Sequence, residues 1–200
     1  MMEQSFALFD TAIGACAIAW NPRGLIGVQL PEADASATRA RMRKRFPDAA
    51  EGTPDSIAQQ AIDGIVALLE GVRDDRGKLR DLRDVAIDES DTPEFNARVY
   101  KIVRQIPPGE TLTYGEVAER LGDRTLARAV GQAMGQNPCP VVMPCHRVLA
   151  AGDRTGSKTG GFSAPGGVVT KLKLLTIEGA QPGGPTLFDA LPLAAAPRAG

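Results

Sequence analysis

The sequence contains few of the residues that build metal sites and disulfide frameworks. It has one histidine and three cysteines among 200 residues. Only Cys139 and Cys145 lie near each other in the chain, and no second Cys or His pair exists, so a tetrahedral zinc site of the usual spacing is not expected. The odd number of cysteines makes a reduced thiol the default state. We therefore expect no metal and no cofactor, and ask which thiol is reactive.

Long apolar runs are also missing. No stretch approaches the roughly 18 uninterrupted apolar residues that a membrane-spanning helix needs. The N-terminus carries Glu3 and Asp10 where a secretory leader would have basic residues followed by an apolar run. A composition of 43% hydrophobic and 24% charged residues is typical of a globular protein with one large domain or two small ones. We expect a cytoplasmic protein without membrane contact.

The charged residues are unevenly distributed, although the formal net charge is only -1. Residues 1–94 contain 11 Lys or Arg against 17 Asp or Glu, whereas residues 95–180 contain 11 against 6. This contrast favours the second half as the place of any contact with a polyanion. Ordinary scatter of surface charge explains the contrast equally well, so charge alone does not decide between the two interpretations.

Residues 1–91 follow the pattern of a small α/β domain with an antiparallel sheet, in outline similar to a ribonuclease H-like fold. Apolar runs separated by turn residues predict the sheet, at residues 5–13, 16–20 and 25–30. Residues 33–45 and a run that opens at Pro54 predict two helices against it. Residues 82–87 predict one further strand, and the acidic loop 88–93 closes the domain.

Residues 92–180 are predicted to be mainly helical. Apolar residues at helical spacing mark a helix over 95–106, which Pro107 and Pro108 terminate. Thr113 and Glu116 have the spacing of a capping box before a short helix over 117–121. A turn then leads to a third helix, about 125–136, which gives the order of a helix-turn-helix, winged-helix-like module. Residues 181–200 are rich in Pro, Gly and Ala and are expected to form a mobile tail.

The third helix has an unusual outward face. Its apolar residues fall on one side, which leaves Arg128, Gly131, Gln132 and Gly135 on the other. Because glycine inside a helix costs about 1 kcal/mol relative to alanine, two glycines on an exposed face require a reason. Close approach of another molecule's backbone is one reason, and tight packing against a neighbouring helix of the same chain is the other.

Cys145 is the candidate nucleophile. Pro138, Pro140 and Pro144 frame the residues before it, which predicts an extended apolar segment that fixes where the thiol points. His146 and Arg147 follow directly, and a neighbouring cation or base activates a thiol by lowering its pKa. Adjacent side chains do not normally face each other, so His146 is expected to reach the sulfur through a water or a tight turn. A carboxylate would then hold the imidazole, and Glu178 is a candidate.

Six motifs of residues 92–180 occur in the order and spacing of a known family. They are Thr113-Tyr114-Gly115, residues 127–131, Gln136-Asn137-Pro138, Pro144-Cys145-His146-Arg147-Val148, Gly160-Gly161-Phe162, and Lys171 through Leu174-Leu175 to Glu178-Gly179. This part of the chain resembles the C-terminal domain of the O6-alkylguanine-DNA alkyltransferases, also called methylated-DNA–protein-cysteine methyltransferases. Residues 1–91 resemble the family's small N-terminal domain only in outline.

The resemblance implies direct, single-turnover repair of double-stranded DNA that contains O6-alkylguanine, by a protein that we expect to be a monomer. Cys145 would accept the alkyl group, and His146, a bridging water and Glu178 would remove its proton. Asn137 would brace the turn that presents the sulfur, and Tyr114 would donate a proton to the departing guanine. The resemblance leaves open whether O4-alkylthymine is accepted.

The resemblance also implies two further sets of residues. Arg128 would enter the duplex and fill the space of the extruded base, and small residues would let the helix approach the minor groove. The expected DNA-contacting residues are Arg128, Tyr114, Gly131, Gly135, Gln132 and Thr113, and the expected base-pocket residues are Met143, Val148, Phe162, Ser163 and Lys171. The chain departs from the family at Phe162, where a tyrosine is commoner, and in a longer loop over 150–159.

Three other classes of protein are alternatives. The alkyltransferase-like proteins bind alkylated DNA without catalysis, sharing the helix-turn-helix and the arginine but lacking the cysteine, so Cys145 argues against them. A thiol hydrolase would use a Cys-His pair, but the sequence shows no second histidine and no recognisable oxyanion site. For a DNA-binding transcription factor, the exposed face of the third helix is the only evidence.

Overall fold

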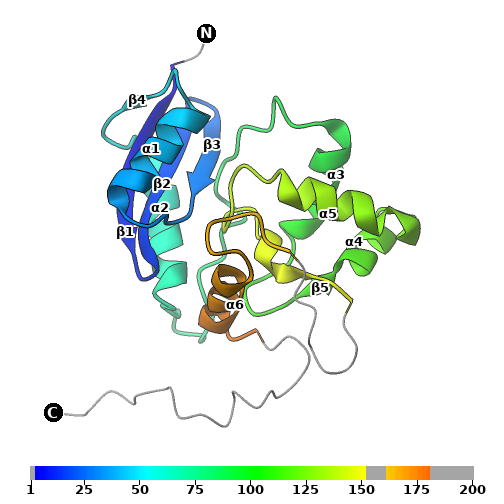
Figure 1. Cartoon of the computed structure of the whole chain (residues 1–200). Coiled ribbons are helices and arrows are strands. Elements are labelled where there is room, and N and C mark those ends of the chain that lie inside the picture. The colour runs from blue at the N-terminus through cyan, green and yellow to red at the C-terminus, as the bar shows by residue number, and fades with distance from the viewer. Residues whose placement is uncertain (1–2, 152–160, 181–200) are drawn as a thin grey trace, which may run out of the picture.

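The computed structural model describes residues 3–151 and 161–180. Figure 1 shows a sheet with helices in the N-terminal half and a group of helices beside it in the C-terminal half. In the described part, no helix is both long enough and apolar enough to cross a bilayer. The predicted C-terminal tail, 181–200, and nearly all of the long loop, 152–159, fall outside the described residues.

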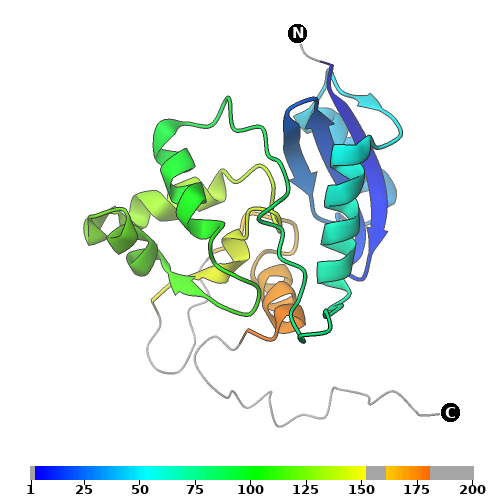
Figure 2. The same cartoon turned by 180° about the vertical axis from the view of Figure 1, so that it is seen from behind.

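The predicted three-stranded meander is confirmed. Strands β1 (Ser5–Thr11), β2 (Gly14–Asn21) and β3 (Gly24–Gln29) pair antiparallel in sequence order. A fourth strand that the sequence did not predict, β4 (Ala50–Glu51), pairs parallel with β1 and gives the order β3-β2-β1-β4. The sheet is therefore mixed, not antiparallel throughout, and β3 is the edge strand nearest to the C-terminal half (Figures 1 and 2).

The strand predicted over residues 82–87 is wrong. This segment makes only an isolated bridge from Ile87 to Leu25, and a turn joins Val85 N to Leu82 O. Three of its backbone carbonyls face a side chain, because Arg104 Nη2 donates to the carbonyls of Leu82, Arg83 and Val85 at 2.7–3.5 Å, and only Ala86 O accepts from a strand, from Leu25 N at 3.0 Å. Two of the apolar residues that suggested a strand, Leu82 and Val85, are buried in a loop.

The two predicted helices of the first half are confirmed. Helix α1 (Ala35–Arg45) begins at Asp34 and α2 (Ser56–Leu69) at Asp55, and each aspartate accepts a hydrogen bond from a backbone N–H of the first turn. Such N-caps satisfy donors that the helix itself leaves unpaired. Helix α1 covers one face of the sheet and α2 the other (Figures 1 and 2).

The two halves of the chain share a hydrophobic core. The face of the sheet that α2 covers packs against apolar residues from the C-terminal half. They are Cys139, Val141, Val142 and Leu174, and all of them are buried together with Ile18, Leu25 and Ile65. The segment before Cys145 is therefore anchored in the core of the first half, which couples the position of the thiol to the sheet.

The predicted helices of the second half are present with shifted bounds. Helix α3 (Glu94–Val103) ends three residues before the predicted 106. The capping box is confirmed: Thr113 Oγ1 accepts from Glu116 N, and the Glu116 carboxylate accepts from Thr113 N. It starts α4 (Tyr114–Arg120) three residues earlier than predicted. A short 3-10 turn, η1 (Arg124–Leu126), precedes α5 (Ala127–Gly135).

The remaining elements surround the cysteine. A 3-10 turn, η2 (Cys145–Arg147), leads into β6 (Val148–Leu149), which pairs parallel with β5 (Leu112–Thr113). Helix α6 (Gly167–Glu178) ends at Gly179, which adopts a left-handed conformation with φ of 71°. This end of α6 places Glu178 beside η2, although the two elements are far apart in the sequence.

Candidate active site

The segment that presents Cys145 is a turn, and the predicted extended conformation is wrong. Met143 N donates to Cys139 O at 2.7 Å, and Val141 lies in the left-handed region with φ of 76°. A β-branched residue with positive φ is uncommon and is held by its surroundings. Val141 and Val142 are buried in the core of the first half, so packing holds the turn that the three prolines only frame.

Asn137 braces this turn, as expected. Its Oδ1 accepts a hydrogen bond from Cys139 N at 2.9 Å, and its Nδ2 donates to Met143 O at 2.8 Å. The same Nδ2 lies 3.0 Å from the sulfur of Cys145. Because Oδ1 faces an N–H donor, the amide nitrogen is the atom that faces the sulfur. Asn137 therefore offers an N–H to Cys145, which favours the thiolate over the thiol.

The electrostatic environment of Cys145 differs from the expectation. Burial raises the pKa of the Cys145 thiol, while the Asn137 hydrogen bond and the Lys171 charge act in the opposite direction. Arg147, which was expected to lower this pKa, is instead bound to Glu178. In the folded protein the thiol therefore keeps its proton at neutral pH and needs a base to become a thiolate.

His146 and Glu178 meet as expected. His146 Nε2 lies 2.9 Å from Glu178 Oε1, and both side chains are buried. Burial by itself raises the pKa of Glu178, but His146 and Arg147 together lower it to about 2. Burial lowers the pKa of His146. Glu178 is therefore an ionised acceptor, which places the proton of a neutral imidazole on Nε2 and leaves Nδ1 as an acceptor. Nδ1 is buried and has no hydrogen-bond partner among residues 3–151 and 161–180.

Arg147 belongs to the site in a way that sequence reasoning missed. Its Nε and Nη2 donate to the two oxygens of Glu178 at 2.9 and 2.7 Å, and its Nη1 donates to Ile106 O at 2.7 Å. The side chain is buried, with an exposed fraction of 3%. A planar guanidinium fits a carboxylate in this two-point manner. The sequence showed only that an arginine follows His146. The planar guanidinium can bind a carboxylate at two points, but the sequence did not identify Glu178 as that carboxylate.

Lys171 and Tyr114 form another side of the site. Lys171 is fully buried, and its Nζ donates to Val148 O at 2.7 Å and lies 5.9 Å from the centre of the Tyr114 ring. Burial lowers the pKa of Lys171 to about 8, against the opposing effect of Cys145. Burial also raises the pKa of the Tyr114 hydroxyl, so this group keeps its proton at neutral pH.

A groove of about 640 Å³ opens at Cys145. Phe162 and Ser163 line it, together with Pro140 and Asn137. Met143, Val148 and Lys171 do not line the groove, because they are buried behind the cysteine. Their expected contact with a base stays a prediction. The far wall of the groove comes from the first half of the chain, through Gln29, Glu32, Arg41 and Arg45.

The outward face of α5 carries the residues expected to contact DNA. Arg128, Gln132 and Gly135 are exposed, and Gly131 is half-buried. A Cβ added at Gly131 would meet only Tyr114 Cε1 at 3.9 Å, an ordinary contact, and one added at Gly135 would meet nothing within 4 Å. Packing inside this chain therefore does not require either glycine. Thr113 is occupied as the N-cap of α4.

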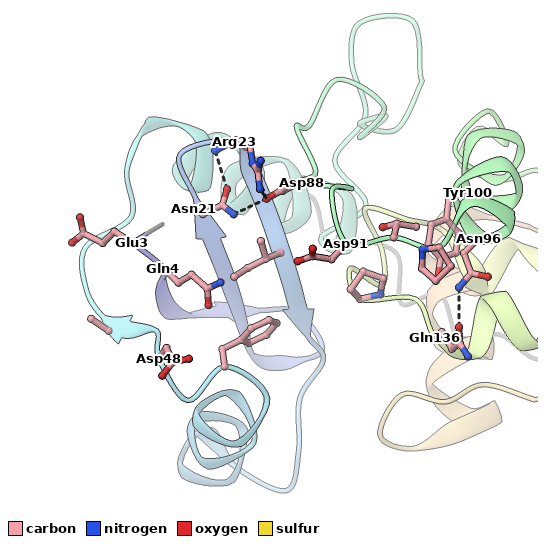
Figure 3. A pocket seen from close by; sticks show the side chains of 16 residues that line it. Glu3, Gln4, Asn21, Arg23, Asp48, Asp88, Asp91, Asn96, Tyr100 and Gln136 are labelled. Atoms are coloured by element: carbon pink, nitrogen blue, oxygen red, sulfur yellow. Dashed lines mark hydrogen bonds and ion pairs between the residues drawn. The ribbon is translucent and has the colours of Figure 1, made fainter. Parts of the chain in front are cut away.

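A separate pocket of about 630 Å³ lies between the sheet and α3 and does not include Cys145 (Figure 3). Asp88 is bound there by Asn21 at 2.7 Å and by Arg23 at 3.1 Å, and Asn96 donates to Gln136 at 2.8 Å. Several further carboxylates line this pocket. Within residues 3–151 and 161–180, no three His, Cys, Asp or Glu side chains gather closely enough to hold a metal ion.

Comparison with known proteins identifies similar sequences. Residues 94–180 match the family described as 6-O-methylguanine DNA methyltransferase, DNA binding domain. The chain is 46% identical over 97 residues to a methylated-DNA–protein-cysteine methyltransferase of Mycolicibacterium paratuberculosis, covering 48% of this chain and 55% of that protein. It is 31% identical over 150 residues to the bifunctional transcriptional activator/DNA repair enzyme Ada of Escherichia coli, covering 75% and 40%. The chain thus matches about half the length of its curated relatives.

Solved structures are similar over more of the chain. The O6-methylguanine methyltransferase of Mycobacterium tuberculosis aligns with a TM-score of 0.63 and 29% identity, covering 88% of this chain and 93% of that one. A structure of the M. tuberculosis OGT in complex with DNA aligns with a TM-score of 0.63 and 28% identity, covering 88% and 92%. The likeness therefore includes the N-terminal sheet as well as the helical half.

Proposed function

We propose that this chain repairs alkylated DNA, because residues 94–180 match the DNA binding domain of the 6-O-methylguanine DNA methyltransferase family. The alkyl group of O6-alkylguanine passes to the sulfur of Cys145, and the protein is consumed in one turnover. The observation that carries this proposal is the thiol at the floor of an open groove, with an amide N–H 3.0 Å from its sulfur and a His-Glu pair beside it.

Proton removal from the thiol follows from the hydrogen bonds of His146. Glu178 holds Nε2–H, so the free acceptor of the ring is the unpartnered Nδ1. We propose that one water joins Nδ1 to the Cys145 thiol, because a buried polar atom without a protein partner is commonly satisfied by water. The thiol proton moves to this water as the water gives a proton to Nδ1. The resulting imidazolium is stabilised by the Glu178 carboxylate.

The transfer step needs help on both sides of the carbon that moves. The thiolate attacks the alkyl carbon, a carbon–sulfur bond forms, and the bond from carbon to O6 breaks with its electron pair going to guanine. The leaving purine then takes a proton, which we assign to the Tyr114 hydroxyl. The product is a thioether, and the described residues offer no group that would reverse it, hence one turnover.

Helices α4 and α5 would form the DNA-binding module, a helix-turn-helix with α5 in the minor groove. The target atom is inaccessible in a stacked duplex, so the nucleotide must be flipped, at a cost of a few kcal/mol. Arg128, which is exposed on α5, would enter the vacated space and offset that cost. Thr113, Gln132 and the two glycines of α5 would border the duplex, and residues 1–91 would serve as the supporting domain.

A stoichiometric transfer assay tests the proposal. Duplex DNA with a single labelled O6-methylguanine is incubated with increasing amounts of protein, and label on the protein is counted. Transfer that stops at one equivalent, and that is lost in Cys145→Ala, supports the proposal. Repeated turnover, or DNA binding without transfer, contradicts it.

A further inference from the structure

One peptide unit of the turn before Cys145 is bound from both sides. The N–H of Cys139 donates to Asn137 Oδ1 at 2.9 Å. The carbonyl oxygen of the same unit belongs to Pro138 and accepts two hydrogen bonds from the first half of the chain, from Val28 N at 2.9 Å and from Arg45 Nη2 at 3.1 Å. The orientation of this peptide plane is therefore set jointly by the edge strand β3 and the last residue of α1.

Arg45 makes these contacts without a charged partner. Its Nη1 donates to Val28 O at 2.9 Å and to Gln29 Oε1 at 3.1 Å, and its guanidinium lies 5.1 Å from the centre of the Phe46 ring. Among the described residues, no carboxylate lies within ion-pair distance of it. A half-buried cation that binds only neutral acceptors is held at a cost in desolvation. Surface arginines of the same helix, Arg39 and Arg43, pair with Glu51 instead.

The backbone of β3 leaves room for this arrangement. A Cβ added at Gly27 would collide with Phe46 Cζ and lie 3.4 Å from Arg45 Nη2, so the glycine lets the ring and the guanidinium approach the strand. Figure 1 shows α1 on this face of the sheet and β3 at the edge facing the C-terminal half. The end of α1 is thus fixed above the Asn137-Pro138 turn.

We propose that Arg45 is a positioning residue for Cys145, acting through the Pro138 carbonyl and Asn137; the inference rests on the proposed function. Arg45 and Val28 hold the Pro138 oxygen, which directs the Cys139 N–H at Asn137 Oδ1. That contact fixes which end of the Asn137 amide faces the sulfur. The Nδ2–H then donates to Cys145 and stabilises the thiolate. The N-terminal domain thus takes part in activating the nucleophile. Its effect passes through Pro138, Cys139 and Asn137, without a direct contact of Arg45 with the sulfur.

The rate of Cys145 alkylation by iodoacetamide as a function of pH measures the thiol directly, without DNA. Peptide mapping separates Cys145 from Cys16 and Cys139, whose pKa values burial raises to about 11 and about 12. The titratable groups around this thiol are His146, Lys171, Tyr100 and Tyr114. None of them is changed in the variants described next. Arg45→Met keeps the aliphatic stem but removes the donors. Arg43→Met, an exposed position of the same helix, is the matched control.

We expect Arg45→Met to raise the apparent pKa of Cys145 and to slow its alkylation at neutral pH roughly fivefold, the effect of one hydrogen bond. Arg43→Met keeps the wild-type profile. In an Asn137→Ser background, Arg45→Met should not change the apparent pKa or the alkylation rate further, because the Asn137 hydrogen bond to the sulfur is already missing. A wild-type profile in Arg45→Met, or an equal further loss in the Asn137→Ser background, overturns the proposal.

Two measurements keep the outcome clear. Thermal unfolding shows whether Arg45→Met folds, and if it does not, Arg45→Lys replaces it, with a smaller pKa rise expected and an unchanged profile counting against the proposal. Alkyl transfer from DNA by the wild-type protein is measured in parallel. Absence of transfer contradicts the proposed function, whereas the iodoacetamide profiles still decide the role of Arg45.

Discussion

Arg147 binds the carboxylate of Glu178 at both oxygens, with Nε to Oε2 at 2.9 Å and Nη2 to Oε1 at 2.7 Å. Glu178 Oε1 also lies 2.9 Å from His146 Nε2, so two consecutive residues of η2 converge on one carboxylate at the end of α6. The pair keeps Glu178 ionised inside the protein. An ionised Glu178 in turn fixes the tautomer of His146 that leaves Nδ1 free to accept a proton.

Glu178→Gln is expected to slow alkyl transfer by roughly a hundredfold, the lower range for general-base catalysis, because His146 then loses the carboxylate that supports it as the base. A neutral amide has a similar shape but cannot stabilise the imidazolium that forms as the thiol loses its proton. Single-turnover transfer from duplex DNA at neutral pH measures the effect. Glu70→Gln, at an exposed carboxylate after α2, is the control and should transfer at the wild-type rate. A Glu178→Gln rate within twofold of wild type would remove Glu178 from the relay.

Arg147→Met should destabilise the fold by roughly 3–5 kcal/mol, because removing one partner of a buried ion pair leaves the other charge uncompensated. The Ile106 carbonyl also loses its donor. Urea unfolding followed by circular dichroism gives the free energy of unfolding. Arg124→Met breaks an exposed pair with Glu119 and should cost less than about 1 kcal/mol. Equal losses in the two variants would show that the Arg147 pair is no more than a surface contact.

Acid should lower the free energy of unfolding by protonating Glu178. The pKa of this group is about 2 in the folded state against 4.5 for an ordinary glutamate, so the unfolded state binds the proton more tightly. Its contribution is therefore complete above about pH 4.5 and is lost as the pH falls toward 2. The loss amounts to about 3 kcal/mol. Comparing the free energy of unfolding of wild type and Glu178→Gln at several pH values isolates this part, and parallel curves for the two proteins would contradict it.

Local patterns predicted most of the fold. The strands and helices of the first half follow from alternation, helical spacing and aspartate caps, which are properties of neighbouring residues. The strand prediction for residues 82–87 failed because three of the segment's carbonyls bind Arg104, a partner about twenty residues away. Strand β4 has only two residues and forms because β1 offers an edge, with Ala50 N bound to Gln4 O and Gly52 N to Phe6 O. Neither event has a signal in the local sequence.

The candidate site shows the same division. Cys145, His146 and Glu178 could be named from the sequence through family motifs, and the structure brings the last two together. The partner of Arg147 and the contact of Arg45 with Pro138 could not, because they depend on how two distant segments pack. The extended segment before Cys145 was a mistake of the same kind: three prolines favour extension, but the buried Val141 and Val142 hold a turn.

Arg128→Ala should reduce repair of duplex DNA about tenfold or more while leaving reaction with the free modified base unchanged. The side chain is exposed on α5, so its loss should remove only the group that we propose fills the space of the flipped nucleotide, at a cost of a few kcal/mol. Rates with duplex and with free O6-benzylguanine are compared. Arg76→Ala, at an exposed arginine of the first half, is the control. Equal losses on both substrates would contradict the role of Arg128 in base flipping.

Gly131 can be used to distinguish two explanations for a glycine on an exposed helix face: packing within the chain and close approach of another molecule. An added Cβ would lie 3.9 Å from the Tyr114 ring, so the protein itself has room for alanine. Alanine is the better helix former by about 1 kcal/mol, and Gly131 lies in the interior of α5. Packing among the described residues thus gives no reason for the glycine, and close approach of the DNA backbone is the reason that we propose.

Gly131→Ala should therefore raise stability and lower DNA affinity at the same time. The free energy of unfolding should rise by about 1 kcal/mol. The affinity for duplex DNA should fall several-fold, since a methyl group holds the helix away from the minor groove and each 1.4 kcal/mol lost is about tenfold. Urea unfolding and fluorescence anisotropy with labelled duplex measure the two effects. Ala133→Gly, at a buried position of the same helix, lowers stability without touching the outer face. A Gly131→Ala protein that binds DNA as tightly as wild type would show that α5 does not approach DNA at this residue.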